Sequence, residues 1–427
     1  MMKIAVIGSG IAGLSCAYHL AREGADVALF EGGDHFGGHS NTVDVTLDGI
    51  SHGVDTGFLV FNERTYPNLI ALFATLGVAT SASDMSFSVK LPRAPGGPML
   101  EWAGANLNTV FAQRRNGIDR RFLGMLADIL RFNRQASEMA IGNSAPAMSL
   151  GRFLDENKYG AAFRHWYLLP MAACIWSCPA AQMLEFPLAS FVRFCHNHGL
   201  LQVSDRPQWR TVTGGSRNYV NKMLAAIARK HLACPVLSVS RNSGGVRVQT
   251  VQGGEQFDQV VLACHSDQAL ALLSDARRDE QSVLGAVRYQ ANRAVLHTDT
   301  SCLPEKQLAW SAWNYQSNGG DDPRVCVHYL LNQLQPLPFK TPLLVSLNPI
   351  DEPDPASVIR SFDYAHPVFD GAAIDAQRRL AAFQGNQNTW FAGAWTGYGF
   401  HEDGLKSGLA VADRLLALCA RQEYAAA

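Results

Sequence analysis

Short apolar runs and helical spacings alternate along the first thirty residues. Residues 4–7 and 25–30 are apolar runs of the kind that a parallel strand buried on both faces requires. Between them, apolar side chains recur at helical spacing as far as Gly24, a residue suited to a left-handed helix end. The pattern therefore predicts a strand–helix–strand unit at the start of the chain.

The same two patterns recur further along the chain. Helical spacing predicts helices over residues 66–76, 218–230 and 404–418. Strand-like runs lie at residues 236–239, 246–251, 258–263, 324–331, 343–347 and 389–392. After a Pro- and Gly-rich crossing at residues 92–98, the pattern up to about residue 205 favours a mainly helical segment.

The composition is that of a globular protein with no dominant charge. Of 427 residues, 47% are hydrophobic and 17% are charged, with 36 Lys and Arg against 37 Asp and Glu. This balance creates no net field for nucleic acid, so we expect no nucleic-acid partner. No apolar run approaches the about 18 residues of a spanning helix, and no export signal opens the chain. We expect a cytoplasmic protein and leave a transient contact with a membrane surface open.

The nine cysteines are scattered, which fits a reducing compartment. One group of side chains could in principle hold zinc: Cys174, Cys178, Cys195, His196 and His198. Its apolar surroundings and the lack of a second close cysteine pair favour buried free thiols instead. His35 and His39 straddle a glycine turn without a helix to align them, so we expect no metal site.

A glycine-rich loop after the first strand indicates a dinucleotide site. Gly8, Gly10 and Gly13 form a G-x-G-x-x-G motif between strand and helix, and Glu31 ends the next strand. Gly8 permits a tight turn, Gly10 lets the backbone approach a pyrophosphate, and Gly13 lets the helix pack close to the strand. The helix amides then face the phosphates, and Glu31 would accept hydrogen bonds from ribose hydroxyls.

Four sequence elements in order extend this motif over essentially the whole chain. They are the acid followed by Gly37-Gly38, Asp55-Thr56-Gly57, the strand Asp258–Ala263, and Ala392-Gly393 before a glycine-led C-terminal helix. This chain resembles the flavin-containing amine oxidase and phytoene desaturase superfamily. The resemblance implies non-covalent FAD as the cofactor.

The resemblance also implies a division of the chain. We expect an α/β fold: an FAD-binding Rossmann-like domain with a parallel sheet, plus an interleaved α+β substrate domain. The FAD-binding domain would take residues 1–88, 210–290 and 386–427. The substrate domain would take residues 89–209, mainly helical, and 291–385, mainly β.

Carried over residue by residue, the resemblance implies contacts with FAD from both ends of the chain. Val236 would contact the adenine through its backbone. Residues 403–405 open a helix whose positive end would lie near the ribityl chain and flavin ring, although Asp403 could equally be a plain N-cap. The implied FAD contacts are Gly8, Ser9, Gly10, Ala12, Gly13, Glu31, Gly38, His39, Gly57, Val236, Gly393, Asp403, Gly404 and Leu405.

Departures from the family pattern argue against amine oxidation specifically. His39 stands where many members have arginine near the pyrophosphate, which leaves less fixed positive charge. The segment 294–298 corresponds to the strand on which amine oxidases place a lysine near the flavin, and it has none. Lys306 lies beyond it, in an expected loop.

The candidate catalytic residues are Tyr398 and His401. Tyr398 resembles one of two aromatic side chains that wall the flavin, and the second would be Tyr364 or Trp313. His401 either points into the pocket for acid–base work or bonds the neighbouring loop.

We therefore expect an FAD-dependent oxidoreductase that removes a hydride from a largely apolar, lipid- or isoprenoid-like substrate, with an unidentified electron acceptor. The alternatives are a flavin-dependent isomerase without net redox, an amine oxidase, and a flavin-bound interaction protein.

Overall fold

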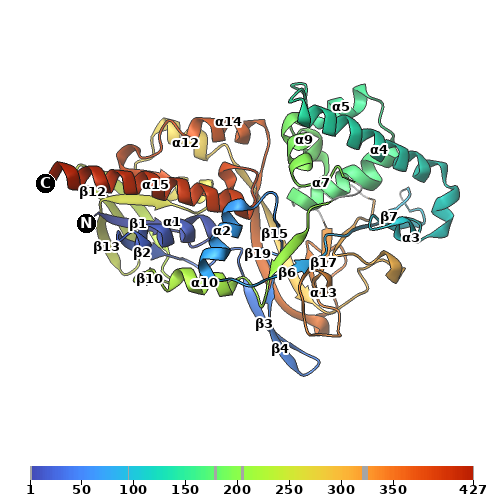
Figure 1. Cartoon of the computed structure of the whole chain (residues 1–427), viewed down its shortest axis with the longest axis horizontal. Helices are drawn as coiled ribbons and strands as arrows, with labels where there is room; N and C mark the ends of the chain where they lie inside the picture. The colour runs from blue at the N-terminus through green and yellow to red at the C-terminus, as the bar shows by residue number, and fades with distance from the viewer. Residues whose placement is uncertain (1, 95, 177–179, 203–205, 320–325, 427) are drawn as a thin grey trace.

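The computed structural model describes residues 2–426 except 95, 177–179, 203–205 and 320–325. A five-stranded parallel sheet forms one half of the molecule (Figure 1). In spatial order its strands are β10 (Arg229–His231), β2 (Asp26–Phe30), β1 (Lys3–Ile7), β14 (Gln259–Leu262) and β20 (Thr389–Phe391). Segments from the beginning, middle and end of the chain thus meet in one sheet, as the interleaved reading predicts.

Both faces of this sheet are buried. Ile4 and Val6 of β1 pack in a core with α1 (Ile11–Arg22) and α15 (His401–Ala426), while Ala5 and Ile7 pack in a second core on the opposite face. The opposite face is covered by β11 (Val236–Asn242), β12 (Gly245–Thr250), β13 (Gly253–Phe257), α11 (Ser266–Leu272), α12 (Arg278–Leu284) and α14 (Gly371–Leu380). Burial on both sides explains why these strands are uninterrupted apolar runs.

A seven-stranded mixed sheet adjoins the first half, with the long strands β15 and β19 at the middle of the molecule (Figure 1). In spatial order its strands are β19 (Val358–Val368), β15 (Arg288–His297), β18 (Leu344–Leu347), β17 (Cys326–Leu330), β16 (Trp313–Gln316), β7 (Phe87–Pro92) and β8 (Met99–Ala103). Helices on its far side are α3 (Leu107–Val110), α4 (Arg120–Ile141), α5 (Leu150–Glu156), α6 (Ala161–Phe163), α7 (Leu169–Trp176), α8 (Ala180–Leu184) and α9 (Leu188–Asn197).

Smaller elements connect the two halves. The short strands are β3 (Thr42–Leu47), β4 (Ile50–Asp55), β5 (Phe61–Asn62), β6 (Thr80–Ser83) and β9 (Trp209–Val212). The remaining α-helices are α2 (Pro67–Leu76), α10 (Arg217–Leu224) and α13 (Leu331–Leu334). Single turns of 3-10 helix lie at Arg114–Ile118, Gln307–Ala309, Pro355–Ser357, Asn386–Asn388 and Ala394–Thr396, and a π-helical turn at Arg164–Leu168.

Most elements confirm the sequence pattern. The first strand–helix–strand unit is present, and both Gly24 and Gly77 follow their helices with positive φ, at 85° and 60°. None of the described helices has the length and apolar character that crossing a membrane requires.

Three expectations need correction. The helix expected over residues 218–230 ends at Leu224, because Arg229–His231 pairs with the open edge of β2. The segment expected to be helical after residue 98 begins with strand β8, which pairs antiparallel with β7. The C-terminal helix begins at His401 rather than at residue 404.

The expected division into two domains stays a prediction. Strand β7 crosses the proposed boundary at residue 88, since it pairs along its length within the seven-stranded sheet. Helix α14 lies in the segment assigned to the substrate domain, yet Ala373 and Ala376 share a core with α12 and the parallel sheet.

Candidate functional site

One cavity of about 450 Å³ lies between the two sheets. It is lined by the loops that follow β1, β2, β14 and β20, and by strands of the seven-stranded sheet. The carboxyl ends of parallel strands are where open α/β sheets bind their ligands. The cavity is therefore the candidate functional site.

The glycine-rich loop has the geometry that each glycine was expected to provide. A Cβ on Gly8, whose φ is 99°, would lie 2.9 Å from the Ala263 carbonyl oxygen, and one on Gly13 would lie 1.9 Å from the Gly8 oxygen. Gly10 is different, because a Cβ there would meet nothing within 4 Å. Gly8 and Gly13 thus allow close contact of the loop and α1 with neighbouring backbone, while Gly10 faces open space in the cavity.

Glu31 ties the loops around this end of the cavity together. One carboxylate oxygen accepts hydrogen bonds from the Ser9 amide at 3.0 Å and hydroxyl at 2.5 Å, and the other accepts from the Gly33 amide at 2.8 Å. The Ser9 hydroxyl also accepts from the Gly37 amide at 3.1 Å. A carboxylate has about four acceptor positions, so Glu31 keeps capacity for a ligand hydroxyl.

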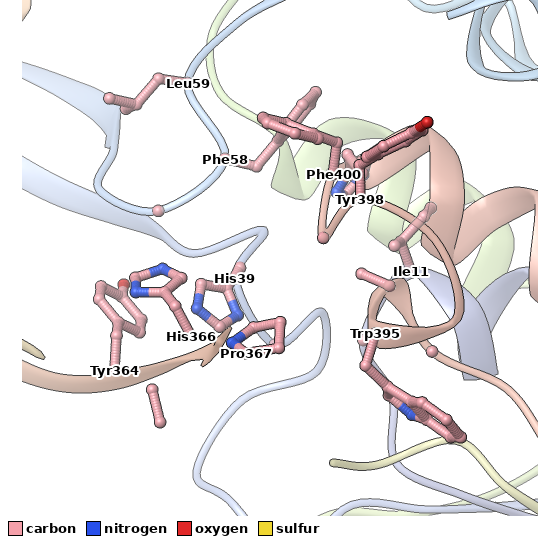
Figure 2. Close-up of a pocket in the computed structure, with 18 of the residues that line it drawn as sticks. Ile11, His39, Phe58, Leu59, Tyr364, His366, Pro367, Trp395, Tyr398 and Phe400 are labelled. Carbon is pink, nitrogen blue, oxygen red and sulfur yellow. The ribbon is translucent and has the colours of Figure 1, made fainter. Parts of the chain in front are cut away.

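Gly38 and Gly57 let His39 approach the glycine loop. A Cβ on Gly38 would lie 3.1 Å from the Gly10 Cα, and one on Gly57 would lie 2.3 Å from the His39 carbonyl oxygen. The His39 ring stacks on Tyr364 with centroids 4.8 Å apart (Figure 2). Burial lowers the pKa of His39 to about 3, and its Nε2 is buried without a hydrogen-bond partner.

These features fit an adenine dinucleotide such as FAD. Open space at Gly10, amides at the start of α1, an acid at the end of β2 and an unpartnered buried nitrogen on His39 are complementary to a pyrophosphate and a ribose. The neutral His39 also agrees with the expectation of less fixed positive charge at this end.

His366 is a cavity residue that the sequence reasoning missed. The Arg293 amide donates to Asn348 Oδ1, Asn348 Nδ2 donates to Asn292 Oδ1 at 2.8 Å, and Asn292 Nδ2 donates to His366 Nδ1 at 2.9 Å. Because Nδ1 accepts, the proton of the neutral ring is on Nε2. Burial lowers the pKa of His366 to about 4, so the ring offers an N–H to the cavity at neutral pH.

The C-terminal motif is only partly at the cavity wall. Gly393 lines the cavity, whereas Asp403, which is the third residue of α15 and not its N-cap, accepts the Tyr398 and Phe400 amides at 3.0 Å each. Burial raises the pKa of Asp403 to about 6. Leu405 is fully buried in the core beside α1, and a Cβ on Gly404 would lie 2.8 Å from Ile11.

The other implied FAD contacts separate in the same way. Ser9 and Ala12 line the cavity with Gly8, Gly10, Glu31, Gly38, His39 and Gly57. Gly13 packs behind the loop, and Val236, at the start of β11, packs against the core on the other face of the sheet. Contacts of Val236, Asp403, Gly404 and Leu405 with FAD stay predictions.

His401 lines the cavity, but its bonding partner is not the neighbouring loop. Its ring stacks on Phe58 with centroids 3.8 Å apart, and its Nε2 lies 2.8 Å from the hydroxyl of Tyr219 in α10. Tyr219 in turn bonds the Ser40 hydroxyl. Burial lowers the pKa of His401 to about 3. An acid–base role for His401 stays a prediction.

Most of the cavity lining outside the glycine-bearing loops is apolar or aromatic, and we call this part of the lining the apolar end. Tyr398 and Phe400, which lie side by side in Figure 2, form one wall with Phe194 of α9. The ring centroids of Phe194 and Phe400 lie 4.9 Å apart. Both candidates for a second aromatic wall, Tyr364 and Trp313, line the cavity. This apolar end is formed by Leu59, Val60, Met85, Ile175, Trp176, Phe194, Leu200, Trp209, Ala294, Trp313, Tyr329, Val345, Leu347, Tyr398 and Phe400.

Charge is confined to the dinucleotide end. Among the described lining residues, Glu31 is the sole carboxylate, and no lysine or arginine is present. The segment 294–298, on which amine oxidases were expected to place a lysine, has none and contributes Ala294 to the cavity, and Lys306 is exposed outside the cavity. Burial also lowers the pKa of His198 to about 4, so the apolar end is uncharged at neutral pH.

The cysteine cluster is consistent with buried thiols. Cys174 and Cys195 are buried and free, and burial raises the pKa of both thiols. Cys178 lies outside the described residues. Within the part of the chain that the structure describes, no group of three or more His, Cys, Asp or Glu could hold a metal ion.

Comparisons with known proteins agree on the fold and the cofactor. A family model described as flavin containing amine oxidoreductase matches residues 11–416. A putative flavin-containing monoamine oxidase, AofH, from Mycobacterium tuberculosis is 26% identical over 276 residues, which cover 61% of this chain and 56% of that protein. The chain therefore spans little more than half the length of that curated relative.

Two solved structures show the same fold over nearly the full chain. A putrescine oxidase gives a TM-score of 0.69 at 16% identity, covering 97% of this chain and 99% of that one. A fatty acid isomerase from P. acnes that produces CLA gives a TM-score of 0.66 at 15% identity, covering 97% and 98%.

Proposed function

The chain belongs to the family of flavin-containing amine oxidoreductases, and we propose that it is an FAD-dependent enzyme that removes a hydride from a largely apolar, uncharged substrate. When bound, FAD supplies the hydride-accepting ring. Gly10, the amides that open α1, Glu31 and His39 would hold it at one end of the cavity.

The uncharged apolar end of the cavity carries this proposal. An ammonium group placed among Trp176, Phe194 and Leu347 would find no carboxylate, and desolvating an unpaired charge is costly. An extended hydrocarbon group would instead exchange water for aliphatic and aromatic contacts. The chemistry of the wall therefore favours a lipid- or isoprenoid-like substrate over a protonated amine.

The chain's own side chains have defined tasks in this scheme. Tyr398 and Phe400 present ring faces that orient an apolar group, since aromatic rings offer a large contact area at low entropic cost. His366 offers a neutral N–H whose position is fixed by Asn292, so it can donate to a polar atom in the cavity without adding charge.

Anaerobic mixing tests the proposal. The yellow protein is mixed with unsaturated fatty acyl and isoprenoid compounds in one series and with primary amines in another, and flavin absorbance is followed. We expect bleaching by members of the first series. Bleaching by amines alone would contradict the proposal and favour amine oxidation.

Product analysis tests the alternative that the protein is an isomerase, in which the same site would use FAD without net redox change. If a lipid substrate is converted to a positional isomer without bleaching and without an electron acceptor, the site works without net redox. Formation of a new double bond, with one acceptor reduced for each product, is the result expected for hydride removal.

A further inference from the structure

The outer surface formed by α3, the 3-10 turn Arg114–Ile118 and α4 is unusually apolar for an exposed surface. We call residues 107–141 the α3–α4 surface. Among its residues Leu107 is 78% exposed, Ile118 86% and Ile141 76%. Leu123 and Leu130 are also exposed. Single exposed apolar residues are ordinary, but several on one surface indicate an interaction site.

The same surface concentrates positive charge. Residues 107–141 contain six arginines, at 114, 115, 120, 121, 131 and 134, and three acids, at 119, 128 and 138, a net charge of 6 − 3 = +3 against −1 for the chain. Asp119 pairs with Arg93 and Asp128 with Arg131. In the described part of the chain, none of the arginines at 114, 115, 120 and 121 forms an ion pair with a carboxylate. Balanced total charge therefore hides a local basic patch.

The periodicity of α4 places both kinds of side chain on its solvent face. Phe122, Met125 and Phe132 are buried in the helical core, while Leu123 and Leu130 are exposed one heptad apart on the other side. The inner face therefore anchors the helix, and the outer face is apolar with arginines beside it.

We propose that the α3–α4 surface docks the protein on an anionic lipid bilayer. The arginines would approach phosphate headgroups, and Leu107, Ile118 and Leu130 would enter the boundary between headgroups and acyl chains. A guanidinium binds phosphate oxygens in pairs, which suits arginine rather than lysine to this task. The surface lies at the end of the molecule opposite the parallel sheet, so docking leaves that half clear (Figure 1).

Charge complementarity favours a bilayer over other occupants. In a symmetric contact between two copies, the arginines of one surface would face those of the other, so pairing would be opposed. Nucleic acid would use the arginines, but single-stranded binding relies on exposed aromatic rings, and the exposed apolar side chains here are aliphatic.

The buried side of α4 packs in the same hydrophobic core as part of the cavity lining. Phe122 and Phe132 of α4 share one core with Trp176 and Phe194, which line the cavity. Docking would place the helical layer that backs this part of the lining against the bilayer. The docking proposal rests on the surface itself and does not require the proposed function.

Vesicle co-sedimentation of the full-length holoprotein tests the proposal. Vesicles of phosphatidylcholine and phosphatidylglycerol in equal parts are compared with phosphatidylcholine alone, at low and high salt. We expect binding to the anionic vesicles that falls with salt. The double variant with Arg120→Gln and Arg121→Gln should show an about 30-fold lower partition coefficient on anionic vesicles. Ile118→Ser should lower the same coefficient about tenfold.

Matched controls change the same chemistry elsewhere. Arg278→Gln with Arg378→Gln removes two exposed arginines from α12 and α14, and Val251→Ser removes an exposed apolar side chain. Both controls should bind as the parent does. Equal binding to neutral vesicles, no binding to either, equal loss in the controls, or a dimer that Ile118→Ser dissociates would each overturn the proposal.

The vesicle result is separable from the proposed function. A protein that binds anionic vesicles but is bleached by amines keeps the docking surface and loses the apolar substrate. A protein that is bleached by lipids in detergent but never binds vesicles keeps the apolar substrate and loses the docking surface.

Discussion

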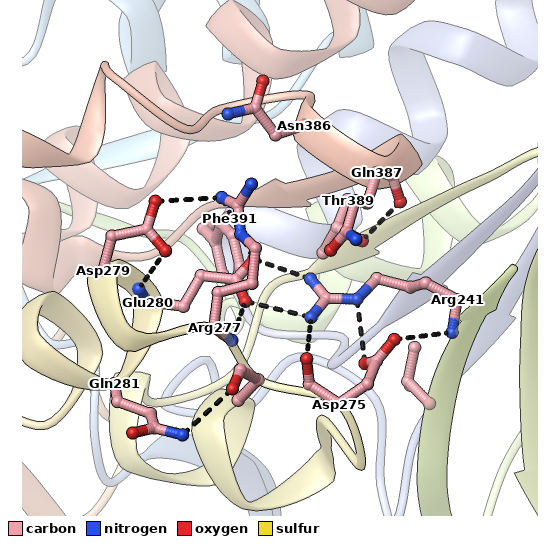
Figure 3. Close-up of polar contacts among 12 residues, drawn as sticks. Arg241, Asp275, Arg277, Asp279, Glu280, Gln281, Asn386, Gln387, Thr389 and Phe391 are labelled. Atoms are coloured by element: carbon pink, nitrogen blue, oxygen red, sulfur yellow. Dashed lines mark hydrogen bonds and ion pairs between the residues drawn. The ribbon is translucent and has the colours of Figure 1, made fainter.

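Two regions of the molecule bury polar side chains in opposite ways. Between β11 and α12, Arg241 donates to both oxygens of Glu280, at 2.6 and 2.9 Å, and to Asp275 at 2.9 Å (Figure 3). The side chain of Arg241 is 1% exposed and that of Glu280 is fully buried. Around the cavity, by contrast, His39 Nε2 and the indole nitrogens of Trp313 and Trp395 are buried without partners.

The difference separates structural from functional burial. Arg241 pairs with both Glu280 and Asp275, so these three charges stabilise the contact between β11 and α12 and leave no free charge among themselves for a ligand. At the cavity, unpartnered groups cost free energy until something supplies the missing hydrogen bonds, and the histidines there stay neutral. The cavity thus offers hydrogen-bonding groups to a ligand, whereas Arg241 and Glu280 are already bonded to each other.

Breaking the pairing of Arg241 with Glu280 should have the largest effect. Glu280→Ala removes one of the two carboxylates that pair with the buried Arg241. The free energy of unfolding, measured by urea denaturation, should fall by about 3 kcal/mol. FAD content of the folded protein should not change. Asp279→Ala, which removes the neighbouring half-exposed carboxylate, should change stability by about 0.5 kcal/mol or less. Equal losses in both variants would contradict this account.

At the cavity, Gly10→Val should lower FAD affinity and leave stability unchanged, the opposite of what is expected from Glu280→Ala. The φ of Gly10 is −58° and a Cβ there meets nothing, so the apoprotein should fold with unchanged stability. The added side chain occupies space that the pyrophosphate needs, so FAD affinity should fall on the order of a hundredfold. Flavin absorbance after dialysis measures the loss.

Gly371→Val, at the first residue of α14 and equally unobstructed, is the matched control for Gly10→Val. Its FAD content should equal that of the parent. If Gly10→Val retained FAD, the glycine loop would not be the pyrophosphate site.

The pH dependence of stability should reveal the neutral histidines. The pKa of His401 is about 3 in the folded protein against an ordinary 6.5, so between these values the unfolded chain binds a proton that the folded chain does not. The free energy of unfolding should therefore fall as pH drops below about 6.5, by on the order of 1 kcal/mol per pH unit for one such group.

Urea denaturation of the FAD-free protein at several values between about pH 5 and about pH 7 measures how steeply the free energy of unfolding changes with pH. His401→Gln keeps a partner for Tyr219 and removes the titration, so its slope should be shallower than that of the parent. An identical slope would mean that His401 is protonated in the folded state.

The smallest effect is expected at the apolar wall. Tyr398→Ala should keep FAD and slow flavin reduction by the substrate about tenfold, because an orienting ring face is lost. Tyr398→Phe keeps the ring and should act nearly as the parent does. Wholesale loss of FAD from Tyr398→Ala would show that the side chain supports the cofactor instead.

How far the sequence predicted the site depends on how local each contact is. Gly8, Gly10, Gly13 and Glu31 act within one strand–helix–strand unit, so their spacing alone defines the loop. His366 could not be found in this way, because its partner Asn292 is 74 residues away and meets it only through the pairing of β15 with β19.

The C-terminal motif shows the same limit. Residues 403–405 were expected to open the helix, but it begins at His401, and helical phase turns Leu405 into the core and Asp403 toward the preceding amides. Composition likewise showed a balanced total charge and could not show that arginines and exposed aliphatic residues share one surface.

We propose that the open cavity receives an uncharged apolar substrate beside FAD. The affinity of the holoprotein for two ligands tests this proposal: both have the same long unsaturated hydrocarbon chain, and one ends in an alcohol and the other in an amine. Binding is followed by the shift in flavin absorbance at neutral pH. We expect the alcohol to bind about a hundredfold more tightly, since the ammonium finds no carboxylate at the apolar end. Tighter binding of the amine would contradict the claim.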